Sequence, residues 1–370
     1  DPTFSFSRAV TPDARSIDDW NADTIFAFEP DFAMHFELAA GDGRACAFGR
    51  RGALQGEGYL SCWGRRMDAS TKYPVSHTTR STGDKFSNVI SIGRDHVCAT
   101  TTTAERRVHC GGSNSKGQNT DPAPILEAEE KKGHWLTDPN LVVSGNHHNC
   151  ALDFYGVYCW GDNGKGQTDV PVMQDVQWIA AGGDTSCAID GNDALICWGD
   201  NSKGQTDIPD YISTVSKVSV GRDFVCASSG GQVDCWGDTE AWDEQPAVYT
   251  NVAHISAGYD HVCILDKIGI TVQASCFGNE NDASDLLAVP VDINTNVRTI
   301  AAGNGFTCAS NNYAGYAWLE EASGGYQAED HKGILCWGKN DEGQASAPKQ
   351  LCLGYNQQAI DYDERTCPEY

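Results

Sequence analysis

Residues 179–205 read IAAGGDTSCAIDGNDALICWGDNSKGQ, and this stretch sets the pattern for most of the chain. Gly182 stands five residues before Cys187, and Cys197 follows a short polar connector and precedes a Trp-Gly pair. The connector, residues 190–193, is Asp-Gly-Asn-Asp, which is rich in residues that tolerate a positive φ. The apolar runs around it predict three short strands, of which the last two form a tight hairpin.

The same pattern occurs seven times along the chain. The repeat glycines are Gly41, Gly93, Gly145, Gly182, Gly221, Gly258 and Gly303. The cysteines five residues after them are Cys46, Cys98, Cys150, Cys187, Cys226, Cys263 and Cys308. The cysteines that follow each hairpin turn are Cys62, Cys110, Cys159, Cys197, Cys235, Cys276 and Cys336. A fixed unit with variable loops is typical of a repeat architecture.

The cysteine spacing predicts one disulfide in each repeat. A tight hairpin places its two flanking cysteines opposite each other, and cross-strand Cα separations of about 4.5–5.5 Å can be bridged. The chain has 16 cysteines, and the two outside the repeats, Cys352 and Cys367, form a further predicted pair. Zinc would require four converging ligands, often from two Cys-x-x-Cys pairs, and that spacing does not occur. A disulfide framework indicates an oxidising compartment.

The repeats predict an all-β fold, a seven-bladed β-propeller with one intrablade disulfide per blade. We expect four strands in each blade, as in known propellers. A closed circle of such blades leaves only short, protected sheet edges. The propeller is expected to span residues 38–345. Residues 1–37 would form an N-terminal arm that supplies a ring-closing strand, and residues 346–370 a tail held by the Cys352–Cys367 disulfide.

Three stretches carry a family resemblance: ISIGRDHVCAT (90–100), ISAGYDHVCIL (255–265) and YCWGDNGKGQTDVP (158–171). They resemble repeats of the regulator of chromosome condensation family, and more closely the secreted beta-lactamase inhibitory propellers of that superfamily. The disulfide-bearing Cys-Trp-Gly form is also similar to the ectodomain repeats of crinkly-type plant receptor kinases. The resemblance implies an extracellular propeller. The nucleotide-exchange and chromatin role of the family is disfavoured by the acidity and the disulfides.

Composition narrows the possible partners. The formal net charge of −25 repels phosphate backbones, which argues against nucleic-acid binding. No run of eighteen apolar residues occurs, so the chain is not expected to span a membrane. The chain begins at Asp1, which we interpret as a processed N-terminus of a secreted, extracellular protein.

Candidate binding residues are the aromatic and basic side chains of the insertions. They comprise Tyr313, Tyr316, Trp318 and Tyr326 in the insertion 310–333, Trp242 in 238–249, and Arg50 and Arg51 in 49–58. Aromatic side chains in loops stack on sugars or anchor protein contacts. Packing of these aromatics beneath their own loops is the alternative interpretation.

No catalytic, metal or cofactor site is predicted. His96, His148 and His261 each stand three residues after a repeat glycine, but other repeats place Arg, Thr or Phe there, which indicates a structural role. The Asp-Asn pairs at 162–163 and 200–201 lack the spacing of a calcium loop and favour side-chain capping of a turn. Motifs of serine hydrolases, phosphate loops and zinc proteases are also missing.

These observations predict a secreted, non-enzymatic propeller that binds an extracellular protein or glycan through its loop insertions. Two alternatives stay open. The first is a structural subunit of a higher-order extracellular assembly, such as an appendage, coat or matrix. The second is a lectin-like, glycan-binding protein.

Overall fold

The computed structural model divides the chain into two units, Asp1–Pro30 and Asp31–Tyr370. The described residues all lie in the second unit, and they are 34–51, 58–65, 86–101, 108–120, 139–239, 242, 249, 251–279, 286–291, 293, 297–311 and 334–347. They form strands joined by turns, and none of them lies in a helix. Within these ranges, therefore, no helix has the length and apolar character needed to cross a bilayer.

Seven antiparallel sheets account for all of the described strands, and each sheet is one blade. Blades 1 to 3 contain β1 Met34–Ala40, β2 Arg44–Arg51, β3 Gly58–Gly64; β4 Phe86–Ile92, β5 His96–Thr101, β6 Val108–Gly112; and β7 Leu141–Ser144, β8 His148–Asp153, β9 Gly156–Gly161. Blades 4 and 5 contain β10 Trp178–Gly182, β11 Thr185–Ile189, β12 Leu195–Gly199; and β13 Lys217–Val220, β14 Phe224–Ser229, β15 Gln232–Gly237. Blades 6 and 7 contain β16 Val252–Ala257, β17 His261–Ile268, β18 Thr271–Gly278; and β19 Val297–Ala302, β20 Phe306–Asn311, β21 Ile334–Gly338.

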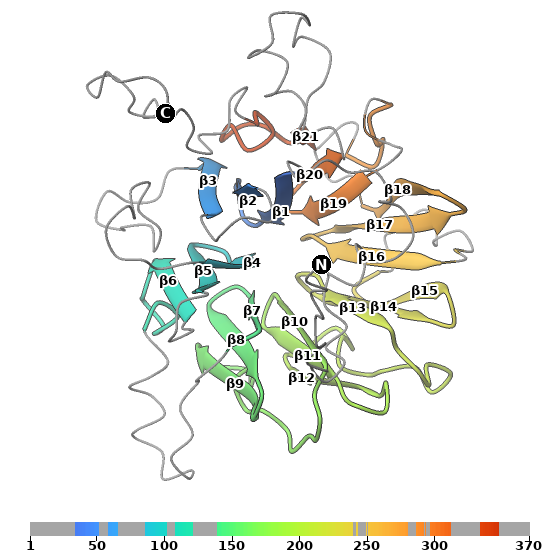
Figure 1. Ribbon diagram of the computed structural model, residues 1–370. Helices are drawn as coiled ribbons and strands as arrows, with labels where there is room; N and C mark the ends of the chain where they lie inside the picture. The colour runs from blue at the N-terminus through green and yellow to red at the C-terminus, as the bar shows by residue number, and fades with distance from the viewer. Residues whose placement is uncertain are drawn as a thin grey trace, which may run out of the picture. The chain divides into compact units, whose positions relative to one another are not determined.

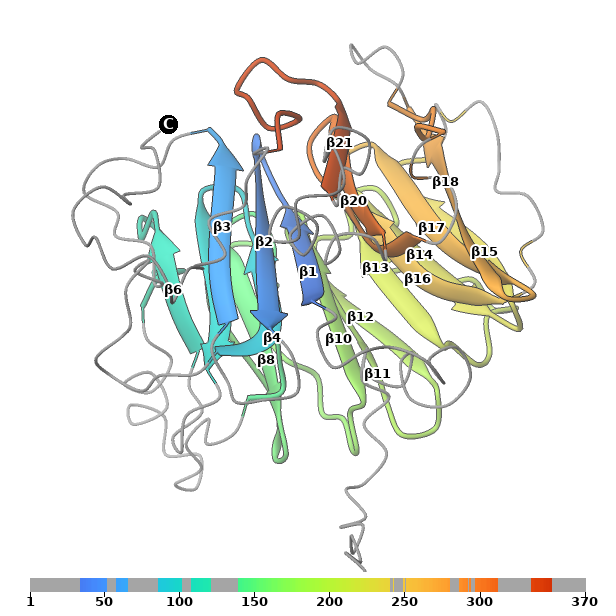
Figure 2. The ribbon, with the colours of Figure 1, turned by 45° about the horizontal axis from the view of Figure 1, so that its top comes forward.

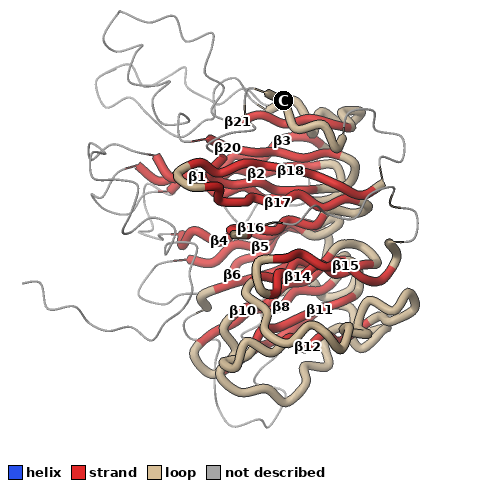
Figure 3. Tube along the Cα trace, turned by 90° about the vertical axis from the view of Figure 1, so that its right-hand side faces the viewer, coloured by secondary structure: helices blue, strands red, loops and turns tan. Residues whose placement is uncertain are grey.

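The blades follow one another around a central axis in chain order, which confirms the predicted seven-bladed propeller (Figure 1). The first strand of each blade lies nearest the axis, and the second and third strands lie successively further out (Figures 1 and 2). Strands run between two faces of the propeller, and the loops gather at the strand ends (Figure 3).

The two faces differ in what they contain. Each inner strand ends at its repeat glycine, and we call that end the glycine face. The second and third strands of each blade are joined at the opposite end, which we call the hairpin face. In blade 3, for example, Gly145 N–H donates to His148 O on the glycine face, whereas Phe154 and Tyr155 form the turn on the hairpin face.

Each sheet contains three strands, one fewer than the four expected from the sequence. In the fully described segments after β9 and β12, the place of a fourth strand is taken by turns. Val170 N–H donates to Thr168 O, and Ile212 N–H donates to Pro209 O, so these residues bond locally. Pro171 and Pro209 also lack the N–H that a strand ladder requires, which explains the difference.

The seven predicted intrablade disulfides are all present. Cysteines of the second and third strands face each other in register, as in Cys187↔Cys197 and Cys226↔Cys235. Their Cα atoms lie 4.0–4.1 Å apart in every blade. The predicted Cys352–Cys367 pair lies outside the described residues.

The hairpin turns follow the predicted chemistry. In blade 4 the carboxylate of Asp190 accepts hydrogen bonds from the backbone N–H groups of Asn192 and Ala194. Asp193 adopts a φ of 61°, and in blade 5 Gly230 and Gly231 have φ values of 61° and 86°. Short polar residues and glycine occupy these positions because they tolerate the left-handed conformation.

The repeat glycines are required because backbones of neighbouring blades approach closely at the axis. A Cβ atom on Gly93 would lie 2.5 Å from Gly145 O, and one on Gly41 would lie 2.8 Å from Gly93 O. The same succession closes the circle, since a Cβ on Gly303 of blade 7 would lie 2.8 Å from Gly41 O of blade 1. Real Cβ atoms do not fit at such distances, so only glycine allows this spacing.

In the five blades that carry a tryptophan after the second cysteine, its indole joins the blade to the segment that follows the preceding blade. The indole N–H of Trp198 donates to Gln167 O at 3.0 Å, and that of Trp236 donates to Gln205 O at 3.0 Å. The indole N–H of Trp63 in blade 1 donates to Gln344 O, which follows blade 7, at 3.0 Å. This bond and the apolar contact of Phe306 with Ala45 close the propeller.

The predicted terminal segments fall largely outside the described residues. β1 begins at Met34 and pairs with β2, so the inner strand of blade 1 starts inside the segment 1–37. Residues 1–33, where a ring-closing strand was expected, and residues 348–370 of the expected tail are not described.

Candidate functional site: the central channel

Most of the binding residues predicted from the sequence lie outside the described residues. These are Tyr313, Tyr316, Trp318 and Tyr326, which belong to the hairpin between β20 and β21. Arg50 and Arg51 lie at the hairpin-face end of β2, where Arg50 pairs with Gly58 of β3. The two hairpins belong to blades 7 and 1, which are neighbours across the closure of the circle.

Trp242 is the one predicted aromatic that the structure describes, and it packs against the protein. Its indole meets Phe224 edge-on at 4.8 Å and Phe277 at 5.6 Å between ring centroids. It joins the apolar cluster between blades 5 and 6. Trp242 therefore takes the packing role that the sequence had left open beside a binding role.

The three repeat histidines are fully buried and bond across blade boundaries. Their Nε2 atoms lie 2.7 Å from Asn149 Oδ1 for His96, 2.9 Å from Ser186 Oγ for His148, and 2.7 Å from Thr307 Oγ1 for His261. Burial lowers the pKa of His148 to about 3 and that of His261 to about 4. The imidazoles of His148 and His261 are therefore neutral, and all three histidines connect neighbouring blades, which agrees with the structural role that the sequence predicts.

The Asp-Asn turns cap themselves. Asn163 Oδ1 accepts from Thr168 N–H at 3.1 Å, and Asn201 Oδ1 accepts from Thr206 N–H at 2.9 Å. Gln205 is buried, and its Oε1 accepts from Lys203 N–H. These contacts are the predicted side-chain capping. In the described part of the chain, no group of three or more His, Cys, Asp or Glu side chains is arranged to hold a metal ion.

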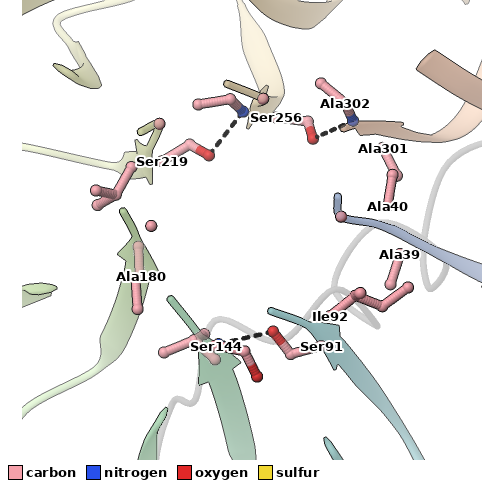
Figure 4. Close-up of a pocket in the computed structure, with 18 of the residues that line it drawn as sticks. Ala39, Ala40, Ser91, Ile92, Ser144, Ala180, Ser219, Ser256, Ala301 and Ala302 are labelled. Carbon is pink, nitrogen blue, oxygen red and sulfur yellow. Dashed lines mark hydrogen bonds between the residues drawn. The ribbon is translucent and has the colours of Figure 1, made fainter. Parts of the chain in front are cut away.

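A central channel runs along the axis between the seven inner strands, with a volume of about 230 Å³. Small side chains line its middle. Ala39, Ser91, Ser144, Ala180, Ser219, Ser256 and Ala301 surround the open space (Figure 4). Its hairpin-face end is lined by larger side chains, including Leu38, Ile90, Trp178, His254 and Ile300.

The channel wall presents backbone as well as side chains, because each inner strand has one unpaired edge. The ladder to the second strand begins with the repeat glycine, whose N–H bonds to the residue three positions on, as in Gly258 N–H to His261 O at 2.8 Å. Hydrogen-bonded and non-hydrogen-bonded pairs alternate along an antiparallel ladder. The N–H and C=O groups of the residue before each repeat glycine therefore point away from the second strand, toward the channel.

Serines of the preceding blade bond three of these N–H groups. Ser91 Oγ accepts from Ser144 N–H at 2.8 Å. Ser219 Oγ accepts from Ala257 N–H, and Ser256 Oγ accepts from Ala302 N–H, both at 2.9 Å (Figure 4). These contacts verify the direction in which the edge groups point.

Tyr259 lies at the glycine-face end of the channel. It follows the repeat glycine of blade 6, and its hydroxyl donates to Asn146 Oδ1 of blade 3 at 3.3 Å. The Arg222 guanidinium lies 5.6 Å from the Tyr259 ring centroid. Burial, and then the nearby Asp42 carboxylate, raise the pKa of Tyr259. A neutral phenol thus spans the mouth, between blades that are far apart in sequence.

Charges around this mouth are paired with one another. Arg222 Nη2 lies 2.8 Å from Asp260 Oδ1, and Arg94 Nε lies 3.8 Å from Asp42 Oδ2. The Arg94 and Arg222 side chains are 56% and 43% exposed, so these pairs are screened by water and stabilise the fold little. The glycine-face mouth of the channel is therefore bordered by groups that bond to one another.

Sequence reasoning did not identify the channel. The usable signal was the residue pattern just before each repeat glycine, where Ala and Ser predominate. That pattern indicates close approach of strands, but it does not show that the strands surround an axis. The Tyr259–Asn146 contact joins residues 113 positions apart and had no local signature.

Comparisons with known proteins agree with this architecture. The regulator of chromosome condensation (RCC1) repeat matches residues 177–205. The entire ectodomain of the receptor kinase CR4 from Physcomitrella patens is similar in structure, with a TM-score of 0.57 and 20% identity over 83% of this chain and 74% of that chain. The CRINKLY WD40 ectodomain of the Arabidopsis thaliana receptor kinase ACR4 has a TM-score of 0.54 and 19% identity, over 83% of this chain and 96% of that chain. Human WBSCR16 has a TM-score of 0.52 and 17% identity, over 75% of this chain and 86% of that chain.

No curated protein sequence matches the chain significantly. At these identities the structural likeness concerns the fold. Residues 177–205 therefore match one regulator of chromosome condensation (RCC1) repeat, and the chain as a whole has the fold of a seven-bladed propeller with one disulfide in each blade.

Proposed function

We propose that this protein is an extracellular, non-enzymatic binding platform that captures another macromolecule on its hairpin face. The observation that carries the proposal is the distribution of hairpin lengths around a rigid, disulfide-bridged circle. Loops held on a rigid scaffold present a contact surface with little loss of conformational entropy on binding.

Hairpin length is concentrated on one side of the propeller. The disulfide-bonded cysteines are 28 residues apart in blade 7, 16 in blade 1, 13 in blade 6 and 12 in blade 2. The same separation is only 9 or 10 in blades 3, 4 and 5. Blades 6, 7, 1 and 2 are consecutive around the circle, so the long hairpins start from adjoining positions on one face.

The candidate binding residues belong to the two longest of these hairpins. Tyr313, Tyr316, Trp318 and Tyr326 are in the hairpin of blade 7, and Arg50 and Arg51 are in that of blade 1. Tyr, Trp and Arg are the residue types that most often dominate binding energy at interfaces. Their concentration beside the closure supports a contact surface centred on blades 7 and 1.

Replacing residues 311–333 with Gly-Gly tests the proposal. Ser310 and Ile334, which flank this segment, are a cross-strand pair, and in blade 5 a Gly-Gly turn already joins such a pair, Ser229 and Gln232. We expect the variant to keep its disulfides and its melting temperature. We expect it to lose about tenfold or more of its partner capture from extracellular fluid, because hot-spot residues carry most of the binding energy.

The matched control is Phe154→Ser on the same face. Phe154 is 78% exposed at the turn of blade 3, on the side of the propeller with short hairpins. This variant should retain capture. Equal capture by the Gly-Gly variant and the wild type would show that blade 7 is not the contact region. Release of the captured partner by glycosidase treatment alone would assign recognition to a glycan.

A further inference from the structure

We propose that the central channel receives one extended peptide segment of the captured partner, which enters from the hairpin face and pairs with the unpaired edges of the inner strands. The inference deepens the proposed function, since it names what the partner would insert beside the hairpins. It rests on the polarity of the channel wall, the size of its side chains and the Tyr259–Asn146 contact across its far end.

The wall of the channel contains backbone N–H groups that no serine hydroxyl of the protein bonds. In blades 3, 6 and 7 the edge N–H is bonded by a serine of the preceding blade. At the other four boundaries between blades, the equivalent residue of the preceding blade has no hydroxyl group. These residues are Ala301, Ala39, Val143 and Ala180. The edge N–H groups that face these side chains are those of Ala40, Ile92, Ala181 and Val220.

These donors decide the chemistry of the occupant. A buried backbone N–H must be hydrogen-bonded, because leaving it unpaired costs about 1–3 kcal/mol. An acyl chain that displaced water from the channel would leave the donors of Ile92 and Ala181 unpaired. An extended peptide brings a carbonyl at every residue and can add to a free strand edge, which is a known mode of recognition.

The shape of the channel limits the occupant further. Its middle is bounded by Ala and Ser side chains, and its volume is about 230 Å³. The small lining side chains favour an extended segment that itself carries small side chains. The larger side chains at the hairpin-face end, among them Trp178 and Ile300, offer apolar contacts to one larger residue of the same segment.

The direction of entry follows from the contacts at the glycine face. The Tyr259 hydroxyl reaches Asn146 across the axis, and the Arg222 guanidinium lies against the Tyr259 ring. We therefore place the entry of the segment at the other end, on the hairpin face, where the hairpins of blades 7 and 1 begin, so that one partner can contact both features.

Amide exchange in the intact protein provides the test. The probe is a pool of N-acetylated, C-amidated hexapeptides built from Ala, Ser, Gly, Val and Thr. We expect the pool to slow hydrogen–deuterium exchange at the amides of Ile92 and Ala181 about tenfold, since exchange reports the opening of hydrogen bonds. The serine-bonded amides of Ser144 and Ala257 are internal controls and should change far less.

Val143→Ser is the matched variant. It recreates in front of Ala181 the arrangement by which Ser91 bonds Ser144 N–H. The variant should reduce the peptide-dependent protection at Ala181 while leaving that at Ile92 unchanged. Disulfide mapping checks its fold, and the exchange measurement on the wild type stands without it.

Three outcomes would overturn the inference. They are no added protection at Ile92 and Ala181 with millimolar peptide, equal protection at the serine-bonded amides, and protection by octanoate but not by peptides. The Gly-Gly variant of blade 7 should bind the peptides normally, because it leaves the channel intact. Loss of partner capture in that variant without channel protection in the wild type would retain the proposed function and reject this inference. Peptide-dependent protection of the channel in the wild type, together with unchanged partner capture by the Gly-Gly variant, would retain this inference and reject the proposed function.

Discussion

At the scale of single residues, the position three residues after each repeat glycine shows how neighbouring blades recognise each other. The side chain there packs against the repeat glycine, as His148 does on Gly145 and Phe224 does on Gly221. Where it is His, the facing residue of the next blade is polar, as in His261 with Thr307. Where it is Phe, the facing residue is apolar, and examples are Phe224 with Val262 and Phe306 with Ala45.

This matching predicts a compensating pair of substitutions. His261→Phe leaves the buried Thr307 hydroxyl without its strong partner and should lower the free energy of unfolding by about 1–3 kcal/mol. Adding Thr307→Val recreates the Phe–Val contact of blades 5 and 6 and should recover most of that loss. Denaturant unfolding of the wild type, both single variants and the double variant measures the coupling. Additive losses would show that the two positions do not recognise each other.

The buried histidines also predict how stability depends on pH. The pKa of His148 is lowered from 6.5 to about 3 and that of His261 from 6.5 to about 4, so the unfolded chain binds more protons than the folded one below pH 6.5. The free energy of unfolding should be constant above that value. As the pH falls from 6.5 toward 4, it should decrease by about 1.4 kcal/mol per pH unit for each of these histidines.

Urea unfolding at a series of pH values checks this slope, and the double variant His261→Phe/Thr307→Val provides the control. It has one titrating histidine fewer between blades, so its stability should fall less steeply between pH 6.5 and 4. An identical slope in the double variant would mean that His261 is not responsible for the dependence.

At the scale of strands and hairpins, the repeat is largely a local structure. Each disulfide joins strands that follow each other directly in the chain, as Cys150–Cys159 does across nine residues. By loop entropy such a bridge stabilises the fold by about 3 kcal/mol, whatever surrounds the hairpin. The expectation of a fourth strand was wrong in blades 3 and 4 because prolines and local turn bonds occupy that segment.

At the scale of the whole molecule, the circle closes through contacts between its first and last blades. The Trp63 indole N–H bonds Gln344 O, and Asn304 Nδ2 donates to Asp42 Oδ1 at 2.7 Å. The closest approach is at the axis, where the glycines of blades 7 and 1 meet. These contacts form only when the rotations that relate successive blades add up to a full circle. Closure therefore depends on the packing at every boundary between blades.

Closure predicts a position-specific effect of adding one methyl group. Gly303→Ala places a Cβ 2.8 Å from Gly41 O and should destabilise the protein by about 2 kcal/mol or more, with faster amide exchange in β1 and β19 than in the middle blades. Gly164→Ala is the matched control, since its Cβ would lie in ordinary contact, 3.6 Å from Asp162 Oδ1. Exchange that rose equally in all blades would show that the added methyl group does not act locally on the contact between blades 7 and 1.

The sequence by itself determined the blades. The number of repeats, the disulfide in each hairpin and the turn chemistry at residues 190–193 were all readable, because each depends on residues that are close together in the chain. The structural role of His148 followed in the same way, by comparison of equivalent positions in the repeats.

Only the tertiary structure decided what the blades enclose. The Tyr259–Asn146 and Trp63–Gln344 contacts join residues separated by several repeats, and the edges at Ile92 and Ala181 face the axis only because successive blades are arranged around it. No local pattern specifies such contacts, because they are set by the rotation between successive blades, summed around the circle. The channel is a property of that sum, and it exists only when all seven blades are in place.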